Sequence, residues 1–160
     1  MKYNNELKKA FQVSIPVMMG YSVLGFAFGL LLVSFEYSWY LAPLMSLFIY
    51  AGALQFVAIS FFNVKAGMID IAIASWFINI RQSFYGLSLL KRFKDTGKFK
   101  TYLIFGLTDE TYALLTTIKD DESLNKRWYY FFLTALNQSY WFIGSTLGAI
   151  IGSNIKFNTV

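Results

Sequence analysis

Arg81, Asp109 and Glu110 are the residues of this sequence best suited to chemistry, because they interrupt stretches that otherwise carry no charge. Arg81 is the only charged residue in the stretch 71–90, and the two acids are the only ones in 101–118. Ionisable groups at membrane depth are costly, and they usually face a cavity or a partner of opposite charge. A pairing of Arg81 with Asp109 or Glu110 would avoid an unpaired charge at membrane depth. These three residues therefore form the candidate site.

Such a site suits a zwitterion, whose passage through a membrane requires a cation and an anion in one cavity. Arg81 offers a planar, bidentate donor for a substrate carboxylate, and Asp109 or Glu110 could hold the ammonium. The two acids are adjacent, so on a helix they point about 100° apart, and we expect one of them to face the cavity. We favour Asp109, because Tyr112 and Phe105 would share its helix face.

Further polar residues recur within the hydrophobic segments. Gln55, Asn79 and Thr108 are predicted to complete the hydrogen bonding around a substrate, and Asn137 is another polar residue at depth. For each of them alone, a bond to a neighbouring helix is the alternative. The alternative for Arg81 is a static ion pair that locks two broken helices together.

If the site instead binds a transported substrate, a carboxylate that loses its arginine partner to the substrate could take up a proton. This possibility predicts that transport is coupled to protons.

The elements that must position these residues are hydrophobic segments. Of the 160 residues, 56% are hydrophobic and 14% are charged, with a mean hydropathy of +0.47. A soluble domain usually carries about 25% charged residues, and a helix needs about 20 apolar residues to cross a bilayer. The sequence therefore predicts an all-α membrane protein. We expect a single transmembrane domain over residues 1–160, with five segments at about 11–35, 38–63, 71–90, 101–118 and 128–153.

The distribution of basic residues indicates which segments cross the membrane. The six stretches outside the segments contain three, none, one, five, three and one Lys or Arg, so five full crossings would place seven on one side and six on the other. That balance gives no orientation under the positive-inside rule. If 71–90 and 101–118 are instead broken or re-entrant, the most basic stretches all become cytoplasmic. Broken helices build substrate sites in many transporters, and five plain crossings are the alternative.

Glycines recur along the first and fifth segments. Residues four apart lie on one helix face, and glycines there let two helix backbones approach closely. Helix packing is the first interpretation of this stripe. The alternative is that Pro16 and Gly20 loosen the first helix and expose its carbonyl groups to a substrate. The stripe consists of Gly20, Gly25 and Gly29 in the first segment and Gly144, Gly148 and Gly152 in the fifth.

Several classes of function are disfavoured by composition. The chain has no cysteine and no histidine, which excludes thiol chemistry, disulfides, histidine proton shuttles and most zinc sites, and we expect no metal and no cofactor. The net charge of +5 comes from clusters between hydrophobic segments, which is the positive-inside pattern and argues against nucleic-acid binding. An intramembrane enzyme could use Asp109 and Glu110 as paired carboxylates. Because no nucleophile motif or cofactor loop accompanies them, we expect no enzyme.

Four strings of residues carry a family resemblance. They are SIPVMMGYSVLGFAFGLL (14–31), YAGALQFVAISFF (50–62), INIRQSFYGLSL (78–89) and GLTDETYALL (106–115). Together they resemble the AzlC family, also called the YgaZ family, of large subunits of branched-chain amino acid exporters. Asn-x-Arg and Thr-Asp-Glu-Thr within hydrophobic segments make the combination specific. Where the family often has His after the arginine, this chain has Gln82, which excludes a histidine-based proton step.

The resemblance implies a multi-pass permease of the bacterial cytoplasmic membrane that moves leucine, isoleucine, valine or similar neutral amino acids outward. It also implies a small membrane partner of the AzlD/YgaH type, and a homo-oligomer is a further alternative. Family members usually continue with more hydrophobic sequence, so we expect a short member or a chain that lacks a C-terminal part of the family fold. A non-transporting assembly or scaffold subunit is therefore the alternative function.

Overall fold

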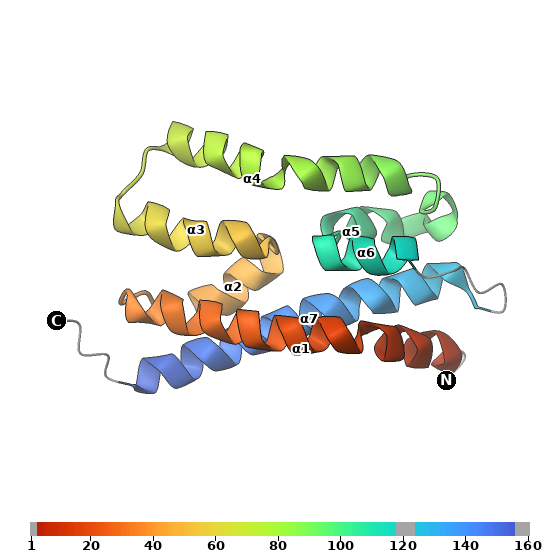
Figure 1. Cartoon of the computed structure of the whole chain (residues 1–160), viewed down its shortest axis with the longest axis horizontal. Coiled ribbons are helices and arrows are strands. Elements are labelled where there is room, and N and C mark those ends of the chain that lie inside the picture. The colour runs from red at the N-terminus through yellow and green to blue at the C-terminus, as the bar shows by residue number, and fades with distance from the viewer. Residues whose placement is uncertain (1–2, 118–123, 156–160) are drawn as a thin grey trace. The chain divides into compact units, whose positions relative to one another are not determined.

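The chain folds into helices, and a computed structural model describes residues 3–117 and 124–155 (Figure 1). No strand occurs within these two ranges, which agrees with the predicted all-α class. Helix α1 is long and apolar enough to cross a bilayer, with a mean hydropathy of 1.9 over its best window. The helices are α1 (Asn4–Ser34), α2 (Leu41–Phe48), α3 (Gly52–Asn63), α4 (Met68–Leu89), the 3-10 helix η1 (Lys94–Phe99), α5 (Lys100–Phe105), α6 (Asp109–Thr117) and α7 (Lys126–Asn154).

The segment 71–90, expected to be broken or re-entrant, forms the continuous helix α4. It contains no proline, and its one glycine is Gly86. An isolated glycine costs a helix only about 1 kcal/mol, so the composition of this segment is compatible with one helix. The structure therefore shows no break within α4, and the re-entrant alternative for this segment stays a prediction.

The segment 38–63, expected to be one element, is instead divided into α2 and α3. The helix ends around Ile49, and Tyr50 adopts a positive φ of 38°. Ala51 is extended, with φ −135° and ψ 91°, and α3 begins at the next residue. A positive φ is uncommon for a residue other than glycine, so the residue type at position 50 does not predict this break.

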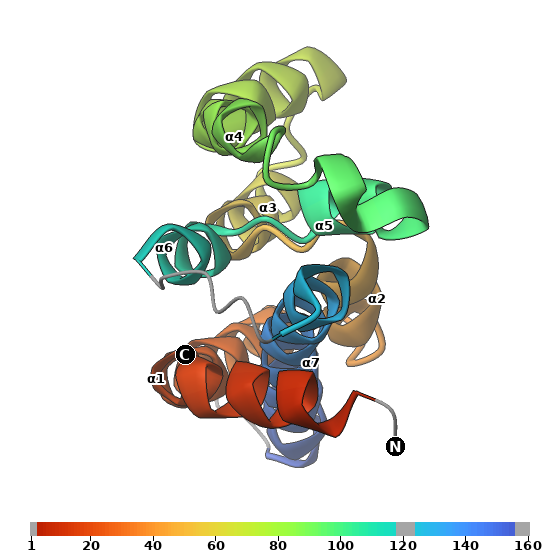
Figure 2. The ribbon, with the colours of Figure 1, turned by 90° about the vertical axis from the view of Figure 1, so that its right-hand side faces the viewer.

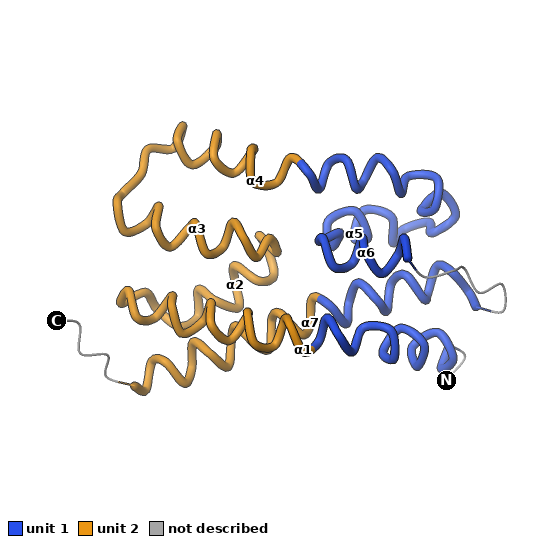
Figure 3. The backbone as a smooth tube through the Cα atoms, in the orientation of Figure 1, with its two compact units in different colours: residues 1–18, 81–137 blue, residues 19–80, 138–160 orange. Residues whose placement is uncertain are grey.

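The chain divides into two compact units (Figure 3). Unit 1 comprises residues 1–18 and 81–137, and unit 2 comprises residues 19–80 and 138–160. Unit 1 has a buried apolar core in which Phe93, Leu103 and Leu133 are fully enclosed, and Tyr130 is almost so. This core joins the second half of α4 to η1, α5, α6 and the first half of α7, which are the elements that carry the candidate site.

In unit 2, α1 and α7 lie side by side along the predicted glycine stripe (Figure 1, Figure 2). A Cβ atom on Gly29 would overlap the Ser145 carbonyl oxygen, and one on Gly148 would overlap the Phe26 carbonyl oxygen. The glycines therefore allow backbone-to-backbone contact, which confirms the packing interpretation. No atom lies within 4 Å of the Cβ position of Gly20.

A hydrogen-bonded cluster fastens α2, α3 and α7 inside unit 2. The Trp141 indole N–H donates to Gln55 Oε1 at 2.7 Å, and Gln55 Nε2 donates to Ser46 Oγ at 3.5 Å. Ser46 Oγ also pairs with Ser145 Oγ at 2.7 Å. Gln55 is fully buried, so both ends of its amide are used in linking three helices.

We expect Trp141→Phe to destabilise the protein by about 1–3 kcal/mol, because it leaves the buried Gln55 oxygen without its donor. Gln55→Leu should cost a similar amount. The double variant should lose less than the two single variants together, since removing both partners leaves no orphaned polar atom. Unfolding of the purified protein in detergent, monitored by circular dichroism, measures this cycle. Strictly additive losses would contradict the coupling of these two side chains.

Candidate functional site

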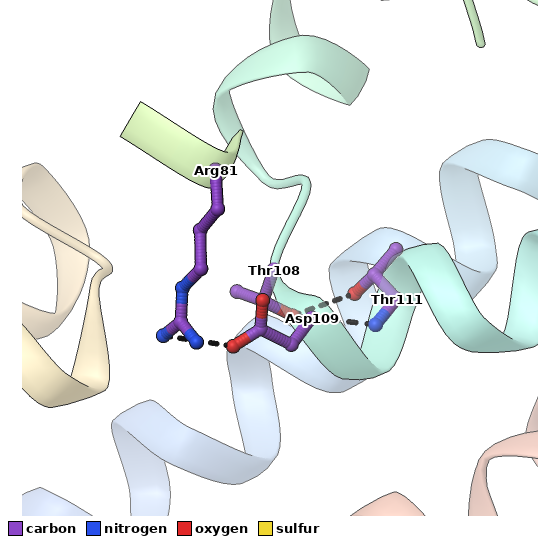
Figure 4. A network of polar contacts seen from close by, with 4 residues as sticks. All are labelled: Arg81, Thr108, Asp109 and Thr111. Atoms are coloured by element: carbon purple, nitrogen blue, oxygen red, sulfur yellow. Dashed lines mark hydrogen bonds and ion pairs between the residues drawn. The ribbon is translucent and has the colours of Figure 1, made fainter. Parts of the chain in front are cut away.

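The predicted pairing of Arg81 with one of the two acids is present in unit 1. Arg81 Nη2 lies 2.9 Å from Asp109 Oδ2 (Figure 4). The arginine projects from α4, and the aspartate is the first residue of α6. The side chains are 50% and 38% exposed, so the ion pair is accessible from outside the described chain. Asp109 Oδ1, however, is buried.

A break in the segment 101–118 places Asp109 opposite Arg81. Helix α5 ends at Phe105, Gly106 follows it, and α6 begins at Asp109. A Cβ atom on Gly106 would overlap the Thr134 methyl group, so glycine lets this break approach α7 closely. The interruption predicted for this segment is therefore found, and it consists of residues 106–108.

Thr108 caps the N-terminus of α6. Its hydroxyl accepts a hydrogen bond from the Thr111 backbone N–H at 3.3 Å, the usual bond of a threonine N-cap. Asp109 and Glu110 then occupy the first turn, where the helix dipole favours negative charge. Thr-Asp-Glu is thus a local signal for a helix start, as well as a source of charge for the site.

Beneath the ion pair lies a buried chain of hydrogen bonds that links α6 to α7. Thr108 Oγ1 and Thr111 Oγ1 are 3.1 Å apart (Figure 4). Asn137 Nδ2 donates to Thr111 Oγ1 at 3.0 Å. Thr111 and Asn137 are fully buried, and Thr108 is 7% exposed. The chain holds the start of α6 at a fixed position against α7.

Two tyrosines flank the carboxylate. The rings of Tyr85 and Tyr112 are stacked, with centroids 4.2 Å apart, and the Tyr85 hydroxyl interacts with Asp109. Ser88 Oγ donates to the Tyr112 hydroxyl at 3.4 Å. Tyr112 follows Asp109 within α6, but Phe105 ends α5 on the other side of the break, so the single helix face predicted for Asp109, Tyr112 and Phe105 is not formed. Tyr85 was not predicted, although its position one helical turn after Arg81 places it on the same face of α4.

The remaining predicted site residues divide between the two units. Glu110 follows Asp109 in α6 and is half-buried. Gln55 and Asn79 belong to unit 2, where Gln55 takes part in the cluster described above and Asn79 is half-buried in α4. Within residues 3–117 and 124–155, no group of three acidic residues could hold a metal ion.

Comparisons with known proteins identify relatives of the chain. The sequence model of the family described as AzlC protein matches residues 16–155. A membrane protein of Helicobacter pylori is 43% identical over 152 residues, which cover 95% of this chain and 67% of the relative. The branched-chain amino acid transport protein AzlC of Bacillus subtilis is 38% identical over 152 residues, which cover 95% of this chain and 60% of that protein.

A further relative is the inner membrane protein YgaZ of Escherichia coli. It is 31% identical over 146 residues, which cover 89% of this chain and 59% of that protein. The chain thus spans between 59% and 67% of the length of these three relatives. No solved structure matches the chain.

Proposed function

The chain belongs to the AzlC family of membrane transport proteins, and on that premise we propose that it exports branched-chain or similar neutral amino acids. It is an all-α protein of the bacterial cytoplasmic membrane. The substrate class follows the name of the relative in Bacillus subtilis. The single observation that carries the proposal to particular residues is the ion pair between Arg81 and Asp109.

The ion pair suits exchange with a zwitterion because its two charges match the two charges of an amino acid. The guanidinium can bind the substrate carboxylate through two parallel hydrogen bonds, and Asp109 can accept the ammonium. When no substrate is bound, the two side chains neutralise each other, which avoids an isolated charge at membrane depth. When the substrate enters, the ion pair between Arg81 and Asp109 is therefore replaced by two ion pairs. One joins Arg81 to the substrate carboxylate, and the other joins Asp109 to the substrate ammonium.

The accessibility of the pair supports this role over a purely structural one. An ion pair that is about half exposed to water contributes only about 0–1 kcal/mol to stability, whereas direct exposure of charge to lipid would be costly. A water-filled path to the ion pair would avoid the cost of exposing charge to lipid, because the two charges stay hydrated. The same path would let a solute reach them. Thr108 and the stacked tyrosines would fix the position of the carboxylate while Arg81 changes partner.

We propose that export is coupled to inward protons through the same carboxylates. A carboxylate that has lost Arg81 to the substrate and is not paired with the substrate ammonium is unfavourable at membrane depth, and protonation removes this cost. Asp109 and Glu110 are both candidates for this step. The partner proposed for the chain is a small membrane subunit of the AzlD/YgaH type. The roles predicted for Gln55 and Asn79 in substrate binding stay predictions, since both residues belong to unit 2.

The proposal is tested by flux through the purified protein in proteoliposomes loaded with radiolabelled leucine. We expect saturable efflux that unlabelled valine and isoleucine inhibit and that an inward proton gradient accelerates. The measurement is made for the chain alone and together with its small subunit. Flux that appears only with another large subunit, and is unaffected by changes in this chain, would support the scaffold alternative instead.

A further inference from the structure

Three buried oxygen atoms that belong to residues around the break at 106–108 have no hydrogen-bond partner within the described residues. They are Asp109 Oδ1, Thr134 Oγ1 and Asn137 Oδ1. Thr134 and Asn137 are both fully buried. Leaving a buried polar atom without a partner costs about 1–3 kcal/mol, so three of them near one helix break call for an explanation.

The oxygen of Asn137 is the free end of its amide because the nitrogen end is already engaged. Asn137 Nδ2 donates to Thr111 Oγ1, and the Thr111 hydroxyl is itself paired with Thr108 Oγ1. The Thr108 hydroxyl also accepts the Thr111 backbone N–H. This chain of bonds orients the amide, and the Asn137 oxygen therefore remains available to a donor that the network does not supply.

The three oxygens belong to residues around the same break. Asn137 and Thr134 are three residues apart in α7 and therefore lie on one helix face. The Thr134 methyl group is the atom that a Cβ on Gly106 would meet. Asp109 begins α6 directly after this break, and Asn137 is joined to the first turn of α6 through Thr111.

We propose that these oxygens form the subsite for the ammonium group of the amino acid substrate, with Asn137 and Thr134 as its specificity-determining residues. A primary ammonium has three N–H donors and no acceptor, so its hydrogen-bonding capacity matches three acceptor oxygens. Asp109 supplies the negative charge, and the two neutral oxygens supply directional acceptors. The inference rests on the proposed function and extends it, since it assigns the ammonium end of the substrate to the face of α7 and the carboxylate end to Arg81.

Thr134→Val is the sharpest variant, because it keeps the shape of the side chain and removes only the hydroxyl. The full chain in lipid nanodiscs is titrated with leucine and with 4-methylpentanoate, which is leucine without its ammonium group. We expect Thr134→Val to weaken leucine binding about tenfold and to leave the binding of 4-methylpentanoate unchanged. Thr134→Ser keeps the hydroxyl and should bind leucine as the wild type does.

A second variant and a stability measurement separate this role from a structural one. Asn137→Ala should weaken leucine binding at least tenfold relative to 4-methylpentanoate. Thr134→Val should unfold at the same temperature as the wild type or higher, since its hydroxyl has no partner in the fold. If both variants leave the ratio of the two affinities unchanged, the ammonium subsite is wrong.

Two further outcomes identify what else could overturn the inference. If sodium ions strengthen binding of 4-methylpentanoate to the wild type, and Thr134→Val removes that effect, the oxygens hold an alkali cation and not the substrate ammonium. If the wild type binds neither ligand, the proposed transport of amino acids fails, and the subsite fails with it. If only the ammonium subsite is wrong, the wild type still binds leucine. This result distinguishes failure of the subsite from failure of the proposed transport.

Discussion

Arg81→Ala is expected to reduce leucine efflux by at least about 100-fold, because it removes the cation that binds the substrate carboxylate. A hydrogen bond to a charged group contributes about 1.5–3 kcal/mol, so loss of the two parallel bonds to the substrate carboxylate costs about 3 kcal/mol or more, and each 1.4 kcal/mol corresponds to a factor of ten. Arg81→Lys should restore only part of the flux, since lysine keeps the charge but lacks the bidentate geometry. Initial efflux rates from proteoliposomes, normalised to the amount of folded protein, provide the measurement.

The matched variants separate loss of the site from loss of charge in general. Asp109→Asn is expected to reduce efflux to a similar extent as Arg81→Ala. Asp95→Asn and Lys94→Ala alter exposed charges in η1, so efflux should stay within about twofold of the wild type. A greater loss in Glu110→Gln than in Asp109→Asn would assign the ammonium to the other acid and contradict the observed pairing.

A double variant distinguishes transport from a static ion pair that holds helices together. Replacing an ion pair by apolar residues of similar size is often neutral or stabilising. Arg81→Met combined with Asp109→Leu should therefore yield folded protein that does not export leucine. Recovery of efflux in this variant would show that the pair is only a structural link between α4 and α6.

Gly148→Ala is expected to produce a large loss of stability from a small substitution. The added methyl group would overlap the carbonyl oxygen of Phe26, which belongs to the backbone of α1 and cannot rotate away. Overpacking of this kind costs about 1–3 kcal/mol, and Gly148→Leu should prevent folding. Thermal unfolding in detergent, followed by circular dichroism or by loss of monodisperse protein on gel filtration, gives the measurement.

Gly20→Ala is the matched control, because it makes the same change in α1 where no neighbouring atom lies within 4 Å. Alanine favours a helix over glycine by about 1 kcal/mol, so this variant should be as stable as the wild type or more so. Equal losses in Gly148→Ala and Gly20→Ala would show that the glycines matter for backbone flexibility and not for close packing of α1 against α7.

The sequence alone determined the membrane character of the chain and the pairing of Arg81 with one of two adjacent acids. Both follow from the position of charges along the chain, because a charge within an apolar segment must find a partner wherever the helices pack. The break at residues 106–108 was predictable for a local reason as well, since Thr-Asp-Glu is a helix N-terminal signal. The packing role of the glycines was equally visible from their spacing.

The choice between the two acids required the tertiary structure. Asp109 and Glu110 have the same chemistry, and their directions differ only once the first residue of α6 is fixed. The break at Tyr50 was also decided by packing, because a positive φ at a tyrosine has no signature in the sequence. Local propensity favours continuing the helix there, and the surrounding structure overrides it.

The buried network was likewise decided by tertiary structure. Asn137 stands out in the sequence as a polar residue in an apolar segment, but its partner Thr111 lies 26 residues away. A polar side chain at depth must be paired, yet nothing in the linear order selects the helix that supplies the partner. The positions of charged and hydrophobic residues along the chain are known from the sequence. Hydrogen-bond partners instead depend on distances between side chains, which only folding establishes.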